Sequence, residues 1–124
     1  MSRARLTLHA WLALIAFDVA RLAGFARVHA WLRRRTATRS RITATIEDVV
    51  WAVDEACVWY VTRAACLQRS VVATYLLRRN GHAASLVVGY RALPFESHAW
   101  VEVCGAIVND RPGYQKHFRV LERL

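Results

Sequence analysis

One cysteine, one histidine and one aspartate in the second half of the chain have the residue types and the order needed for covalent catalysis. Cys66 opens a segment of helical periodicity, CLQRSVVATYLLRRNGH. It therefore lies at or just inside a predicted helix N-terminus, where unpaired N–H groups and the helix dipole stabilise a thiolate. His98 and Asp110 follow on the two sides of a predicted β-hairpin. A thiolate, an imidazole that takes its proton and a carboxylate that orients the imidazole form a Cys-His-Asp triad.

The meeting of His98 and Asp110 depends on the register of that hairpin. The stretch SHAWVEV alternates in polarity, and AIVND follows as the partner strand. With a three-residue loop ending in glycine, Glu102 pairs with Ala106 and His98 lies opposite Asp110, with Cβ atoms roughly 5 Å apart. A two-residue loop moves the pairing by one residue and removes this match. We predict the three-residue loop.

Each triad candidate also has an explanation that needs no chemistry. Cys66 fits a small buried hydrophobe, His98 a hydrogen-bonded strand histidine, and Asp110 a turn residue that caps its own backbone. The other cysteines fit structural roles, since Cys57 falls on the apolar stripe of a helix and Cys104 in a turn. Three cysteines without a C-x-x-C motif predict neither a metal site nor a disulfide framework. They favour reduced thiols in a cytoplasmic protein.

Local signals outline the elements that position these residues. A threonine N-cap with first-turn acids at 45–48 predicts a helix that runs to about residue 60 or 63. The helix that begins at Cys66 ends at Asn80-Gly81, which supplies a left-handed residue. The apolar run ASLVVGY then predicts a buried strand ahead of the hairpin. This order predicts an α+β fold in which helices precede a small sheet.

The N-terminal third carries most of the positive charge. The net charge is +9, and residues 1–41 contain nine arginines against one acid, Asp18. The apolar run at 6–17 is shorter than the roughly 20 residues that span a bilayer, and no A-x-A cleavage site follows. We therefore predict a helix and expect no membrane association. The residues expected on its buried face, at three- and four-residue steps, are Leu8, Leu12, Ile15, Val19 and Leu22.

A weaker helical pattern continues after Gly24 and ends in three arginines, Arg33, Arg34 and Arg35. Cations suit a helix C-terminus, where they meet the negative end of the dipole. Two interpretations stay open. The run is the solvated end of a core-packing helix, or it is a docking surface for a partner or an acidic ligand.

Three short motifs make the sequence recognisable. They are C-L-Q-R-S at residues 66–70, H-A-W-V-E at 98–102 and V-N-D at 108–110. In their helix–strand–strand setting they resemble the lasso-peptide leader peptidases, small transglutaminase-like cysteine proteases of lasso-peptide biosynthesis. The resemblance covers roughly residues 55–112, and the N-terminal third carries no motif of this family. Cys104 departs from the Asp-Gly-type turn expected at its position.

The resemblance implies a transglutaminase-like or papain-like fold, with the cysteine helix packed on an antiparallel sheet. It implies Cys66 as nucleophile, His98 as base and Asp110 as the orienting acid, without a cofactor. The family cleaves the leader from a ribosomally made precursor peptide, and a separate cyclase then closes the core peptide. In the split form of the system, a winged-helix recognition protein presents the leader. This chain resembles the stand-alone protease, with these proteins as expected partners.

Four further residues have less direct assignments. Gln68 and Trp100 are candidates to line the substrate or oxyanion pocket, together with the backbone N–H of Cys66. Plain core packing explains Trp100 equally well. Arg69 and Ser70 match the first motif and are expected to support the helix and the pocket.

Two other functions are compatible with the sequence. The same triad can transfer acyl groups to amines instead of water. A non-enzymatic basic protein would bind RNA or DNA with strong salt dependence, but no nucleic-acid-binding motif is present, so nucleic acid is not an expected partner. At 124 residues we expect one domain, made of an Arg-rich helical segment (1–41) and a protease core (45–124).

Overall fold

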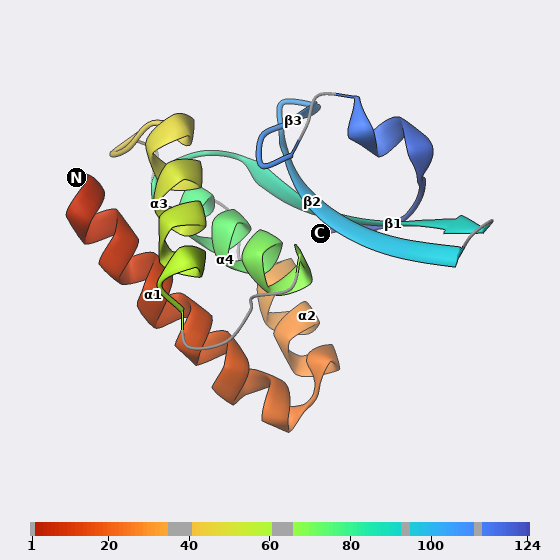
Figure 1. The fold of residues 1–124 in the computed structure, drawn as a ribbon, viewed down its shortest axis with the longest axis horizontal. Coiled ribbons are helices and arrows are strands. Elements are labelled where there is room, and N and C mark those ends of the chain that lie inside the picture. Colours follow the sequence, from red (N-terminus) through yellow and green to blue (C-terminus); the bar gives the residue numbers. More distant parts are fainter. Residues whose placement is uncertain (1, 35–40, 61–65, 93–94, 111–112) are drawn as a thin grey trace.

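Four α-helices and a four-stranded sheet make up the computed structural model, which describes residues 2–34, 41–60, 66–92, 95–110 and 113–124 (Figure 1). The helices group on one side of the sheet, as the α+β prediction requires. In chain order the elements are α1 (Arg3–Ala20), η1 (Arg21–Ala23), α2 (Phe25–Arg34), α3 (Ile46–Val58), α4 (Cys66–Arg79), β1 (Ala84–Ala92), β2 (Phe95–Val103), β3 (Ala106–Ile107), η2 (Tyr114–His117) and β4 (Arg119–Arg123).

The ends of α3 and α4 agree with the sequence signals. Thr45 caps α3, and its hydroxyl accepts a hydrogen bond from the backbone N–H of Asp48 at 3.1 Å. Gly81 ends α4 with φ 94°, and the N–H of His82 returns to the carbonyl of Leu77 at 2.9 Å. A Cβ at Gly81 would also lie 2.6 Å from the carbonyl oxygen of Arg41. This position therefore needs glycine for both its backbone angle and its space.

The sheet is antiparallel throughout, in the order β3-β2-β1-β4. The hairpin of β1 and β2 is longer than predicted, since its pairing runs from Ala84–Val103 to Ala92–Phe95. The C-terminal strand β4 pairs with the free edge of β1 and was not predicted. Its sequence, RVLER, is short and mixed in polarity, so its strand conformation depends on that edge.

The two faces of the sheet have different coverings. Leu86, Ala99 and Val101 are buried on the face that packs against the helices. Trp100 and Phe118 pack together on the opposite face. Because side chains alternate along a strand, His98 and Trp100 share the face that lies away from Ala99.

The hairpin loop between β2 and β3 has two residues, not three. Val103 pairs with Ala106, so the predicted register is wrong by one residue. Cys104 (φ 53°) and Gly105 (φ 78°) both adopt left-handed backbone, the geometry of a two-residue type I′ turn. The ladder then ends before Asp110.

The predicted buried face of α1 is also wrong. Leu6, Ala10, Leu14 and Phe17 are buried, whereas Leu8, Leu12, Val19 and Leu22 are exposed and Ile15 is partly exposed. The run LTLHAWLALIAF is apolar on nearly every side, and such a helix cannot be oriented from its periodicity. Packing against α3 and α4 selects the face.

Candidate active site

His98 and Asp110 contact one another although the predicted register fails. The Nε2 atom of His98 lies 2.6 Å from Oδ2 of Asp110, and both side chains are largely buried. Strand β3 stops after Ile107, so the chain is free to turn back toward β2. The contact arises from this irregular segment and not from cross-strand pairing.

Asn109 holds that segment in place, with a side chain only 8% exposed. Its Oδ1 accepts a hydrogen bond from the backbone N–H of Val101 at 2.9 Å, at a point where β3 no longer supplies a carbonyl. Its Nδ2 donates to the hydroxyl of Ser70 at 3.1 Å. The amide therefore joins β2 to α4 directly beside Asp110, and it satisfies buried polar groups on both.

The first turn of α4 lies against β2 next to His98. The hydroxyl of Ser70 donates to the carbonyl of Ala99 at 3.1 Å. Cys66 begins α4 one turn before Ser70, on the same side of the helix. Cys66 is partly buried and packs against the cluster that contains Ala99, the chain neighbour of His98. The predicted nucleophile thus lies at a helix N-terminus, and that helix is bonded to the histidine strand.

Arg69 and Ser70 contact the segments around the proposed site, and their supporting role stays a prediction. The Nη2 atom of Arg69 lies 3.4 Å from the carbonyl oxygen of Asn109, and its Nη1 lies 3.8 Å from a carboxylate oxygen of Asp54. Arg69 therefore links α3, α4 and the segment that carries Asp110. The motif C-L-Q-R-S thus includes two residues whose contacts position the loop after β3.

Aromatic rings enclose His98. The Phe118 and Trp100 rings stack beside it, with centroids 5.5 and 6.1 Å away. Trp100 is fully buried and donates its indole N–H to Glu102 at 2.9 Å. It shares the face of His98, as the alternation predicted, and these rings shield the imidazole from water.

Gly89 makes the space that Trp100 occupies. A Cβ at this position would lie 2.8 Å from Cη2 of Trp100 and 3.0 Å from the carbonyl oxygen of Arg119. Gly89→Ala is therefore expected to lower the free energy of unfolding by about 1–3 kcal/mol, because the ring or β4 must shift. Urea unfolding measures the change. Ser97→Ala, at an exposed position of β2, is the control, and an unchanged midpoint for Gly89→Ala would contradict the packing argument.

Gln68, a candidate to line the pocket, contacts α1 in this structure. It is 5% exposed, and its Nε2 donates to the carbonyl of Leu14 in α1 at 3.0 Å. Its amide therefore connects two helices. The pocket role of Gln68 stays a prediction, and in this structure its amide donor is used by the contact with α1.

The arginines at the end of α2 do not form one free cluster. Arg33 makes an ion pair with Glu122 of β4. The carboxylate of Glu122 also lies 2.7 Å from Nε2 of His29. Arg34 is exposed, and Arg35 lies outside the described residues. The docking role predicted for this run therefore stays a prediction for Arg34 and Arg35, while Arg33 binds within the chain.

The other cysteines differ from Cys66 in their surroundings. Cys57 packs against the core, and burial raises the pKa of its thiol. Cys104 is exposed in the turn after β2. Within the described part of the chain, no group of three or more His, Cys, Asp or Glu side chains is placed to hold a metal ion.

Sequence reasoning missed the roles of Asn109 and Phe118. Asn109 was visible only as the middle letter of the V-N-D motif. No pattern in the sequence marks Phe118, because the segment after β3 has no periodicity. Phe118 reaches His98 only through the tertiary fold.

Comparison with known proteins places the chain in context. The sequence model of the transglutaminase-like superfamily matches residues 13–123, which includes the last eight residues of α1 and all of α2. The chain is 34% identical over 64 residues to the microcin J25-processing protein McjB of Escherichia coli. That alignment covers 52% of this chain and 31% of the relative, so the chain spans less than a third of the relative's length. No solved structure matches it significantly.

Proposed function

The chain belongs to the transglutaminase-like superfamily, and we propose that it is a cysteine endopeptidase that removes the leader from a lasso-peptide precursor. The hydrogen bond between His98 and Asp110, beside the first turn of the Cys66 helix, carries the proposal. The resemblance of the motifs to leader peptidases and the name of the relative, a peptide-processing protein, support the substrate class.

The two nitrogens of His98 have different roles in this mechanism. Nε2 faces Asp110, so the neutral ring carries its proton there and donates it to the carboxylate. Nδ1 is then the atom that takes the proton of Cys66. Asp110 holds this tautomer and stabilises the imidazolium that forms, as the carboxylate of a serine-protease triad does.

Peptide hydrolysis then follows in two steps. The Cys66 thiolate attacks the carbonyl carbon at the leader–core junction, and the C–N bond breaks to leave a thioester on the enzyme. The imidazolium of His98 donates its proton to the departing amine, which is the new N-terminus of the core peptide. His98 next takes a proton from water, the hydroxide attacks the thioester, and the leader leaves with a carboxylate as the thiol is restored.

The proposed partners follow from the same assignment. The precursor peptide is the substrate, a winged-helix recognition protein presents the leader, and a cyclase uses the freed amine. Tethering by a recognition protein would raise the effective concentration of the scissile bond at the enzyme. We assign the protein to the cytoplasm, where its thiols stay reduced.

The roles of His98 and Asp110 predict a graded loss of activity. His98→Ala should reduce leader removal to background, because no base remains. Asp110→Asn should keep measurable activity, because the base remains but its tautomer is no longer held; the equivalent change in a serine triad costs about 10⁴-fold. Mass spectrometry of a precursor incubated with the recognition protein and each variant gives the rates. Equal activity of Asp110→Asn and the wild type would contradict the orienting role.

Acyl transfer is the second candidate function, because the thioester can be opened by an amine as well as by water. The same mass spectra separate the two. A free core-peptide amine with a leader carboxylate indicates hydrolysis, whereas a new amide on the leader fragment indicates transfer.

A further inference from the structure

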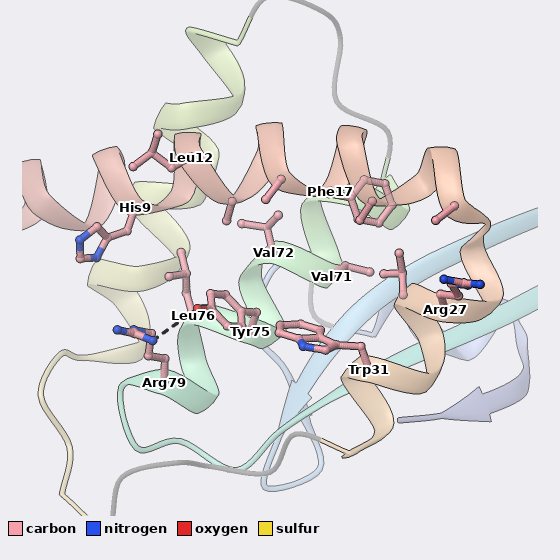
Figure 2. A pocket seen from close by; sticks show the side chains of 15 residues that line it. His9, Leu12, Phe17, Arg27, Trp31, Val71, Val72, Tyr75, Leu76 and Arg79 are labelled. Carbon is pink, nitrogen blue, oxygen red and sulfur yellow. Dashed lines mark hydrogen bonds between the residues drawn. The ribbon is translucent and has the colours of Figure 1, made fainter.

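A groove of about 680 Å³ lies behind the proposed catalytic helix, between α1 and α2 (Figure 2). One face of α4 forms its floor, with Val72, Tyr75 and Leu76. Leu12 of α1 and Trp31 of α2 stand on opposite sides. Pockets of 300–1,000 Å³ with mostly apolar linings are typical of binding sites.

Part of the apolar lining of the groove is exposed, although Val72 and Leu76 of its floor are buried and the Trp31 ring packs against Tyr75. Leu12 is 49% exposed and Trp31 is 40% exposed. Between them the α1 wall carries Ala13, Ala16 and Ala20, which are small enough to let another backbone approach closely. Of the residues wrongly predicted on the buried face of α1, Leu12 lies in this wall, beside these alanines.

Two arginines, Arg27 and Arg79, carry the charge of the groove lining, and both are cationic. His9 and Arg79 stand at one end, and Arg27 stands toward the other. None of the described residues that line it is acidic. Its electrostatic complement is therefore a ligand with apolar groups in the middle and carboxylates toward both ends.

The groove and the proposed active site use opposite sides of α4. Cys66 and Ser70 face β2, and Ser70 bonds to Ala99 there. Tyr75 and Arg79 point into the groove on the other side. A ligand in the groove would therefore leave the Cys66 side open.

We propose that this groove binds an amphipathic helix of a partner protein, with an apolar stripe flanked by Asp or Glu. The α1 wall from His9 to Ala20 is about 16 Å long, which equals about three turns of a bound helix. Helix-in-groove recognition uses anchors at such i, i+3, i+4 and i+7 spacing. This inference goes beyond the peptidase chemistry and does not depend on Cys66.

A concave site favours a helix over a bilayer surface. The segment Arg3–Ala23 is long and apolar enough to cross a membrane, but length and composition alone are weak evidence for a membrane-spanning helix. In this structure, however, Leu6 and Leu14 of the same helix are buried in the protein core. A flat bilayer would also contact the rims of the groove and not its floor of Val72 and Leu76.

The test is fluorescence anisotropy of a labelled 14-residue peptide, with Leu at helical spacing and Glu at both ends, added to the full chain. A scrambled peptide of the same composition and a version with Lys in place of Glu are the peptide controls. The protein variants are Arg27→Glu/Arg79→Glu and the matched reversal Arg5→Glu/Arg41→Glu outside the groove. Ala16→Trp fills the groove without changing its charge, and thermal unfolding checks that each variant is folded.

We expect the acidic helix to bind the wild type, and the groove reversal and Ala16→Trp each to raise the Kd about tenfold or more. Arg5→Glu/Arg41→Glu should leave the Kd within about twofold. The proposal is overturned if the acidic helix shows no binding up to about 100 µM, if the scrambled peptide binds equally, or if the two reversals have equal effects. Co-sedimentation with phosphatidylglycerol vesicles that depends on Arg27 and Arg79, without peptide binding, would assign the groove to a membrane and also overturn it.

Discussion

Cys66→Ala is expected to abolish leader removal, with a loss of about 10⁶-fold as for the nucleophile of a serine-protease triad, while the protein stays folded. Removal of the nucleophile of a triad takes away covalent catalysis altogether, because the remaining residues act only through it. Cys66 is partly buried at the start of α4, so the loss of one sulfur should change the free energy of unfolding by only about 1 kcal/mol. Mass spectrometry of the precursor measures cleavage, and thermal unfolding verifies the fold.

The other two cysteines supply matched controls for this experiment. Cys104→Ala removes an exposed thiol and should leave cleavage unchanged. Cys57→Ala removes a thiol whose pKa is raised by burial, and it should affect stability more than activity. The triad assignment collapses if Cys66→Ala cleaves at the wild-type rate. Loss of cleavage in Cys104→Ala instead would move the nucleophile to the turn after β2.

Arg78→Leu is expected to lower the free energy of unfolding by about 3 kcal/mol or more. Arg78 is 8% exposed, and its guanidinium donates to the backbone oxygens of Ala84, Leu32 and Leu124, at 2.7–2.8 Å. Burial lowers the pKa of this guanidinium, but an arginine keeps its charge at neutral pH. Leucine would leave these carbonyls without that donor, at a cost of about 1–3 kcal/mol for each buried group. Urea unfolding measures the loss.

The neighbouring arginine is the control for Arg78. Arg79 is exposed in the same last turn of α4, so Arg79→Leu removes an equal charge and should change stability by only about 0.5 kcal/mol. Arg78→Lys should lose an intermediate amount, because a single ammonium cannot reproduce the planar fork. Equal effects of Arg78→Leu and Arg79→Leu would show that helix-end charge, and not the carbonyl contacts, accounts for the stability.

The contacts around Asn109 explain why two motifs distant in sequence occur together. Ser70 of C-L-Q-R-S and Asn109 of V-N-D share a buried hydrogen bond, and Arg69 reaches the carbonyl of Asn109. The helix of the proposed nucleophile and the segment of the proposed acid are thereby joined. We infer that this connection holds Asp110 against His98, so the motif residues without chemistry of their own act by positioning.

Local signals in the sequence determined much of the helical part of the fold and the first two strands. The cap at Thr45 and the stop at Gly81 depend on hydrogen bonds and a backbone angle within a few residues of each position. The strand alternation that placed His98 and Trp100 on one face is equally local. Cys66 at a helix start could therefore be predicted without any tertiary contact.

Other features were decided only by the tertiary structure. The nearly uniform apolar surface of α1 could not show which face α3 and α4 would bury, and the unburied face became one wall of the groove. The contact of His98 with Asp110 does not come from strand pairing, because the two-residue turn shifts the register by one residue. After β3 ends, the side chain of Asn109 accepts the backbone N–H of Val101 in place of a strand carbonyl. Polar side chains such as Gln68 and Arg78 have several possible partners along a chain. The packing of the helices decides which backbone carbonyls these side chains reach, and no local sequence pattern predicts that choice.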